Sequence, residues 1–154
     1  MTGSIEASGN VNSMLSSDFE NITSLSGYVY AFRYLFCDCT SLTKAPDLPA
    51  TTLAQGCYSS MFFGCTLLTK APDLPATTLA SYCYSYMFEG CTGLTEVRIA
   101  ATTTATGALD SWLLNVYVSG TVYADPNFTG LPTDSASGVP SGWTRLNIND
   151  YPTT

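Results

Sequence analysis

The hydrophobic and polar positions of the chain repeat every 26 residues. The segment 39–54 recurs almost unchanged as 65–80, and the same offset relates Met61 and Phe62 to Met87 and Phe88. Self-similarity at a fixed period indicates a row of equivalent units that bury their apolar faces against one another.

Each unit contains the patterns of two elements. In residues 82–88, the Tyr-x-x-Met-Phe motif spaces its apolar side chains as one face of a helix, and Gly90 follows as a helix stop. The Cys-Thr-x-Leu-Thr motif indicates a very short strand. We expect that strand to end near Pro46 or Pro72, because proline has no N–H to donate to a neighbouring strand. The pattern predicts one short parallel strand and one short helix in every unit.

Degenerate copies extend the array in both directions. The register places about four units in residues 28–124, with an N-terminal cap in 1–27 and a C-terminal cap or tail in 125–154, where Trp143 is the expected hydrophobic pin. A 26-residue period lies within the range of roughly 20–29 residues typical of leucine-rich repeats. The predicted fold is therefore α/β, a single-domain, short, right-handed leucine-rich-repeat solenoid with caps.

Composition and charge exclude several partners. Only 11% of the residues are charged, the net charge is −7, and five Lys and Arg form no basic stripe. We therefore expect no binding of nucleic acid or of an anionic membrane surface. No apolar run approaches the ~18 residues of a membrane span, so membrane insertion is not expected. The N-terminus lacks the basic and apolar regions of a signal peptide.

The residues needed for catalysis are missing or scattered. The chain has no histidine, the commonest general base and metal ligand. It also has no Gly-x-Ser-x-Gly motif, and its twelve acidic residues are spread along the sequence. We expect no catalytic residues, no cofactor and no metal site.

Five of the six cysteines recur with the repeat, so equivalent thiols should stack on one another. The favoured interpretation is a ladder of buried thiols, because free cysteine is among the most buried residue types. Disulfides within Cys57/Cys65 and Cys83/Cys91 remain the alternative. Cys37 breaks the register and is expected near the surface. The predicted ladder comprises Cys39, Cys57, Cys65, Cys83 and Cys91.

A second column is aromatic. Tyr58 stacks under Tyr84, and Tyr82, Tyr86 and Phe63 flank them. Such rings would form a rigid platform for a glycan or protein ligand if they are exposed. The alternative is that most of them pack between repeats.

A third column is charged. It places Lys44 over Lys70 and Asp47 over Asp73, which predicts a solvated salt-bridge ladder. Two carboxylates fall short of the six to eight oxygens that calcium requires.

The unit Met-Phe-x-Gly-Cys-Thr-x-Leu-Thr, followed by Leu-Pro-Ala-Thr-Thr-Leu-Ala, resembles the BspA-type leucine-rich repeats of gut Bacteroidetes and their phages. The closing Ser-Gly-Val-Pro-Ser-Gly-Trp-Thr at 137–144 resembles the tail that ends many such arrays. The resemblance covers roughly residues 9–145. It implies a role in adhesion or host recognition without catalysis.

Two functions follow as hypotheses. The first is a recognition module on a bacterial surface or phage virion, extracellular in either case, that binds a protein or glycan of the host. The second is a structural virion protein whose end repeats dock on other virion or surface proteins or on a second copy of the chain. That alternative predicts that Leu113, Leu114 and Val116 are covered only in an oligomer.

Overall fold

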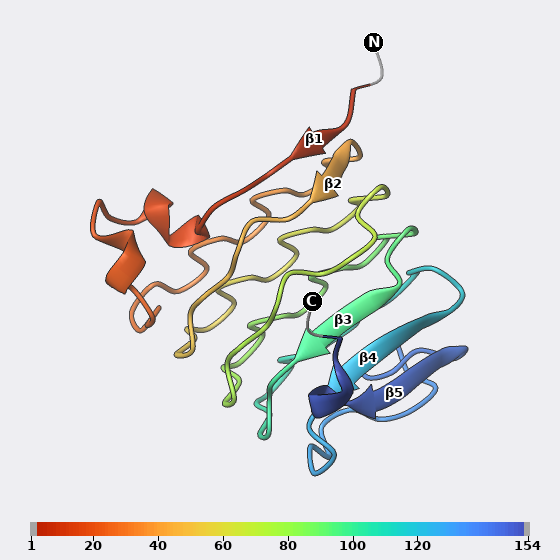
Figure 1. Cartoon of the computed structure of the whole chain (residues 1–154). Helices are drawn as coiled ribbons and strands as arrows, with labels where there is room; N and C mark the ends of the chain where they lie inside the picture. Colours follow the sequence, from red (N-terminus) through yellow and green to blue (C-terminus); the bar gives the residue numbers. More distant parts are fainter. Residues whose placement is uncertain (1–2, 153–154) are drawn as a thin grey trace.

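The computed structural model describes residues 3–152, in which the chain winds back and forth as a stack of similar circuits (Figure 1). Regular structure is sparse within this range. The strands are β1 (Ile5–Glu6), β2 (Leu42–Lys44), β3 (Glu96–Ile99), β4 (Gly120–Ala124) and β5 (Trp143–Asn147). Single 3-10 turns form η1 (Val11–Met14), η2 (Phe19–Asn21) and η3 (Ile148–Asp150).

All strand pairing is parallel and lies along one side of the stack, which we call the strand side. β1 pairs with β2, and β3, β4 and β5 form a second sheet in that order. Between the named strands, isolated bridges such as Lys70 with Glu96 and Thr78 with Thr103 continue the same parallel arrangement. Each circuit is therefore bonded to the next through residues about one sequence repeat apart.

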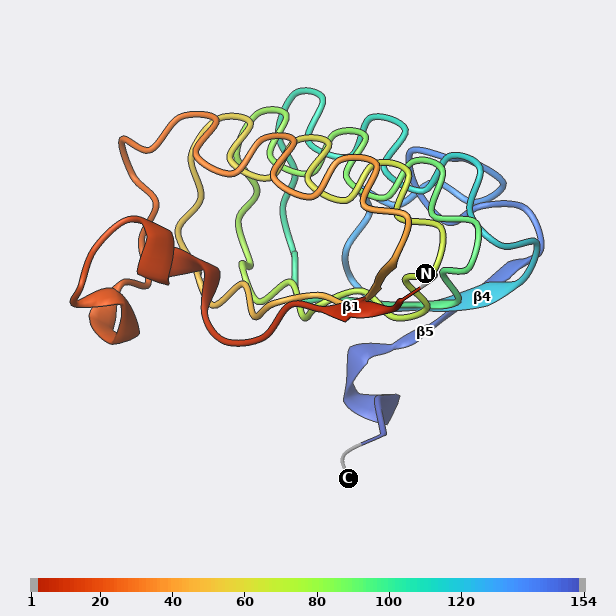
Figure 2. The ribbon, with the colours of Figure 1, turned by 90° about the horizontal axis from the view of Figure 1, so that it is seen from above.

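The opposite side, which we call the turn side, is a succession of tight turns (Figure 2). Its backbone N–H groups alternate between two kinds of partner. The N–H of Cys83 donates within its own circuit to the carbonyl of Ala80 at 3.2 Å, whereas the N–H of Tyr84 donates to Ala108 of the next circuit at 2.9 Å. We call the turn-side segment of each circuit a rung. The first to fourth rungs are residues 30–38, 56–64, 82–90 and 107–115.

The predicted α/β leucine-rich-repeat solenoid with one helix per unit is wrong. Residues 3–152 contain no helix of seven residues or more, and the segment 82–88 is part of the turn side. Every fourth residue there has a positive φ, at Tyr82 (57°), Tyr86 (53°) and Gly90 (74°). A left-handed residue in every turn cannot propagate a right-handed helix. No helix in the described range is long and apolar enough to cross a membrane.

The core lies between the two sides and is built from columns of equivalent side chains. Phe36, Phe62 and Phe88 stack with ring centroids 5.6 and 5.7 Å apart. A parallel column of Phe32, Tyr58 and Tyr84 has centroid separations of 5.8 and 6.1 Å. Offset-stacked aromatic pairs add about 0.5–1.5 kcal/mol each beyond the area they bury, so these columns hold successive rungs in register.

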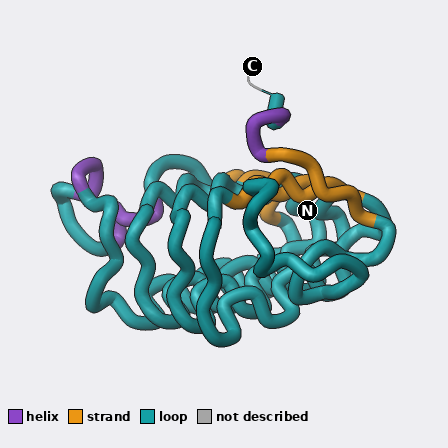
Figure 3. The backbone as a smooth tube through the Cα atoms, turned by 90° about the horizontal axis from the view of Figure 1, so that it is seen from below, coloured by secondary structure: helices purple, strands orange, loops and turns teal. Residues whose placement is uncertain are grey.

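The last rungs are closed by the C-terminal segment. Arg145 on β5 lies in register with the buried Val122 and donates to the carbonyls of Asp125 and Phe128, both at 2.7 Å. The indole of Trp143, which is 8% exposed, donates to the carbonyl of Tyr117 at 2.7 Å. Beyond β5, η3 leaves the stack on the strand side (Figure 3).

Candidate functional site

A hollow of about 280 Å³ opens on the turn side, across the first three rungs. Its rim is made of four exposed tyrosines and an arginine, and its floor is made of serines. We call it the tyrosine hollow. The lining residues are Tyr30, Arg33, Tyr34, Ser59, Ser60, Tyr82, Ser85 and Tyr86.

The repeat positions the four tyrosines. Each occupies one of the positive-φ positions that recur every fourth residue, with φ between 53° and 60°. Their exposed fractions lie between 40% and 51%, so these positions direct side chains outward. The second and fourth rungs carry only small residues at the equivalent places. The two resulting columns read Tyr30, Gly56, Tyr82, Gly107 and Tyr34, Ser60, Tyr86, Ser111.

The tyrosine rings lie over the small residues of the following rung. A Cβ atom on Gly56 would overlap the ring of Tyr30, and one on Gly107 would overlap the ring of Tyr82. The ring above therefore requires glycine at these two places, whereas the positive φ alone does not, because Tyr30 and Tyr82 adopt nearly the same φ. The alternation of large and small residues gives the rings defined positions on the surface.

The first-rung wall of the hollow is further held by polar contacts. The guanidinium of Arg33 lies 4.6 Å from the ring centre of Tyr34 and 5.3 Å from that of Tyr30. It also donates to the hydroxyl of Tyr34 at 2.9 Å, and the Gln55 amide donates to the hydroxyl of Tyr30 at 3.0 Å. Cation–π and hydrogen-bond contacts together fix the two rings before any ligand arrives.

The floor of the hollow is hydroxyl-bearing. The hydroxyls of Ser59 and Ser85 are hydrogen-bonded to each other at 3.0 Å, and Ser60 lies beside them. In this hydrogen bond one hydroxyl donates its hydrogen and the other accepts, so the accepting hydroxyl keeps its own hydrogen to donate to a ligand. Ser59 and Ser85 occupy equivalent positions of the repeat, and at the same position the first rung has Arg33 and the fourth has Asp110.

Of the predicted platform residues, Tyr82 and Tyr86 lie on the rim of the hollow. Tyr58 and Tyr84 are 1% and 0% exposed and stack in the core, so they are not part of an exposed platform. Their hydroxyls have no hydrogen-bond partner in the described structure, and burial raises the pKa of both phenols. Phe63 is half-buried and does not line the hollow.

Sequence reasoning missed Tyr30, Tyr34 and Arg33. The first unit departs from the 26-residue consensus, and its Tyr30 and Tyr34 align with the small residues Gly56 and Ser60 of the next unit. An offset of two units, 52 residues, relates Tyr30 to Tyr82 and Tyr34 to Tyr86. A search for that longer period would have found the four tyrosines of the rim but not Arg33, which aligns with Ser85.

All six cysteines are free, so neither Cys57/Cys65 nor Cys83/Cys91 forms a disulfide. Cys57, Cys65, Cys83 and Cys91 are buried, whereas Cys37 and Cys39 are half-buried. Burial raises the pKa of the thiol of Cys57 to about 11 and those of Cys65 and Cys83 to about 12. These thiols therefore stay protonated at neutral pH, which makes them poor nucleophiles and poor metal ligands.

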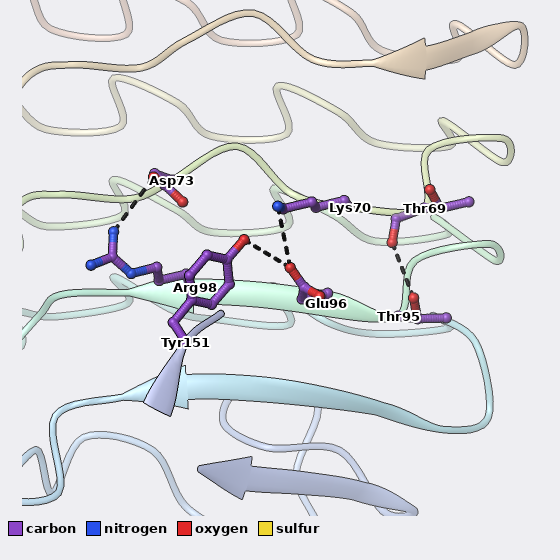
Figure 4. Close-up of polar contacts among 7 residues, drawn as sticks. All are labelled: Thr69, Lys70, Asp73, Thr95, Glu96, Arg98 and Tyr151. Carbon is purple, nitrogen blue, oxygen red and sulfur yellow. Dashed lines mark hydrogen bonds and ion pairs between the residues drawn. The ribbon is translucent and has the colours of Figure 1, made fainter. Parts of the chain in front are cut away.

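The charged column on the strand side is paired differently from the prediction (Figure 4). Lys70 pairs with Glu96 of the next circuit at 3.5 Å, and Asp73 pairs with Arg98 at 3.4 Å. Tyr151 folds back from the C-terminal segment and donates to Glu96 at 2.8 Å. Its ring lies 5.1 Å from the Lys70 ammonium and 5.2 Å from the Arg98 guanidinium. These charges satisfy one another, so the cluster is better suited to fastening the tail than to holding a ligand.

Metal-binding geometry is absent from residues 3–152. No group of three or more His, Cys, Asp or Glu side chains gathers in this part of the chain.

Comparison of the chain with known proteins gives no match among protein-family models, curated proteins or solved structures.

Proposed function

We propose that the chain is a non-enzymatic recognition module that binds a glycan or protein ligand through the tyrosine hollow. One observation carries the proposal: four exposed tyrosines and Arg33 gather around one hollow on the turn side, above a floor of serines. Exposed aromatic side chains and an arginine that line one hollow are typical of a recognition site.

The construction of the hollow supports recognition. Aromatic side chains supply large, rigid and amphipathic contact area with few torsions to fix. The contacts of Arg33 and Gln55 hold the rings of Tyr34 and Tyr30 in advance, which lowers the ordering cost of binding.

We further propose that the chain acts outside cells, on a bacterial surface or a virion, as a host-recognition module. The low charge content and hydroxyl-rich surface favour this setting, as does the resemblance of the repeat motif to BspA-type repeats. The alternative of assembly through end repeats predicted that Leu113, Leu114 and Val116 are covered only in an oligomer. Leu113 is 1% exposed within the single chain, and Leu114 and Val116 are half-buried, so these residues leave no fully exposed apolar face and the recognition hypothesis is preferred.

The test is binding of the labelled chain to a glycan array and to a panel of host-surface glycoproteins. Wild type is compared with Tyr34→Ala and Tyr86→Ala, after circular dichroism has shown that the variants fold. Tyr117→Ala serves as the control, because Tyr117 is 49% exposed but lies outside the hollow.

Binding that is lost in both hollow variants and kept in the control supports the proposal. The proposal fails if the chain binds neither panel, or if it binds one of them equally well without Tyr34 and Tyr86.

A further inference from the structure

We propose that the tyrosine hollow takes an acidic sugar, with the sugar carboxylate on Arg33 and the sugar ring against Tyr34 and Tyr86. This inference rests on the proposed function, because it names the ligand class of the same site.

Arg33 is an exposed cation without an anionic partner in the described structure. Lys70 and Arg98 are in ion pairs, Arg145 donates to two backbone carbonyls, and Lys44, which also has no ion pair, lies on the strand side. Arg33 instead lines the hollow, where its cation lies against the Tyr30 and Tyr34 rings. In a chain of net charge −7, a cation placed in a concave aromatic site points to an anionic ligand group.

A carboxylate fits the donors that Arg33 has left. The guanidinium has five N–H donors, and only the bond to the Tyr34 hydroxyl is formed within the protein. The remaining planar donors suit a carboxylate, which guanidinium binds through two parallel hydrogen bonds. The net charge of −7 works against a polyanion, so the ligand should carry one charge near this end and not many.

The lining of the hollow offers aromatic surface to a sugar ring. Tyr34 and Tyr86 line the hollow from the first and third rungs, and its volume is about 280 Å³. An aromatic ring contacts a sugar ring at about 3.5–4.0 Å. A saccharide would present its C–H face to a tyrosine and its hydroxyls to the serine floor.

A peptide is less well matched to this surface. An extended peptide gains affinity by pairing with free backbone N–H and C=O groups of its host. The second-rung N–H groups that run beneath the hollow are already bonded, Tyr58 to Cys83 at 3.1 Å and Ser60 to Ser85 at 2.9 Å. Side-chain hydroxyls and rings are the groups left for recognition, and these match a sugar.

The experiment is isothermal titration of the full chain with two matched oligosaccharides, one ending in glucuronic acid and one ending in glucose. Arg33→Gln is the test variant. Lys44→Gln is its matched control, because it also removes one exposed cation without an ion pair but lies on the strand side. We expect wild type to prefer the acidic oligosaccharide by about tenfold and Arg33→Gln to lose that preference. Lys44→Gln should keep it, and Tyr86→Ala should weaken both ligands.

Three outcomes would overturn the inference. In the first, both oligosaccharides bind equally well, Arg33→Gln changes neither affinity, and Tyr86→Ala abolishes both. The hollow would then be a recognition site that does not select for an acidic sugar. Binding confined to proteins, and dependent on Tyr34 and Tyr86, would also leave the proposed function standing. Tighter binding of heparin than of the singly charged sugar would show that charge density, and not one carboxylate, is recognised.

Discussion

Replacing the buried tyrosine Tyr84 by phenylalanine should make the protein more stable. The Tyr84 hydroxyl is fully buried and has no hydrogen-bond partner in the described structure. Leaving such a group unsatisfied costs about 1–3 kcal/mol. The substitution keeps the ring in its stack, where Phe32 already occupies the equivalent place two rungs away. Even a void of about 20 Å³ would cost only about 0.5 kcal/mol. We therefore expect a net gain of about 1 kcal/mol.

The assay is urea unfolding of wild type and Tyr84→Phe, followed by far-ultraviolet circular dichroism. A gain of this size raises the midpoint without changing the slope, and raises the melting temperature by about 2–4 °C. Tyr82→Phe is the control, since the Tyr82 hydroxyl is on an exposed side chain and its loss should change stability by less than about 0.5 kcal/mol. A loss of 1 kcal/mol or more in Tyr84→Phe, at unchanged slope, would refute the reasoning by showing that the hydroxyl is bonded.

Three further predictions concern the thiols, a glycine and the tail. The unfolding free energy should fall above pH 9, because the unfolded chain releases thiol protons that the folded chain keeps. For Cys83, whose folded pKa is about 12, this amounts to about 1.4 kcal/mol at pH 10, and Cys83→Ala should remove that part of the pH dependence between pH 7 and 10. Gly107→Ala should lower the unfolding free energy measured in urea by about 2 kcal/mol, because both the positive φ and the Tyr82 ring oppose a Cβ atom. Gly9→Ala is the control, since Gly9 has a positive φ but no neighbouring atom in the way, so it measures the backbone cost alone. Equal losses of stability in the two variants would contradict the contact with the Tyr82 ring. Tyr151→Phe removes the hydrogen bond from the Tyr151 hydroxyl to Glu96 (Figure 4) and should lower the unfolding free energy by about 0.5–1 kcal/mol. An unchanged urea midpoint would mean that the C-terminal segment does not pack against Glu96.

The sequence was sufficient to predict which residues become equivalent neighbours. The 26-residue offset correctly aligned Met61 with Met87 and Cys57 with Cys83, and all four are buried. The secondary structure between these positions was wrong for a geometric reason. Side chains four residues apart differ by about 40° on a helix, so three such steps still fall within one broad apolar stripe. A true period of four therefore looks helical over a segment this short.

The signal that separates the two cases lies in the other positions. Gly56, Ser60 and Gly64 also recur every fourth residue, and all three have a positive φ. Residues that tolerate a positive φ at every fourth position indicate a row of consecutive turns. A helix would need only one such residue, at its C-terminal end. The same four-residue spacing assigns Tyr82 to the exposed positions and Tyr84 to the buried ones. A helical interpretation of the segment does not distinguish these two tyrosines.

The alternation of tyrosine and small residues on successive rungs has a consequence for how such a chain can grow. One sequence repeat adds one rung, but the pattern of Tyr34, Ser60, Tyr86 and Ser111 returns only after two. Duplicating a single 26-residue unit would place two tyrosines, or two small residues, on adjacent rungs and would change the spacing between the tyrosines. Duplicating a pair would copy the hollow whole, so the recognising surface should gain or lose sites only by even numbers of repeats.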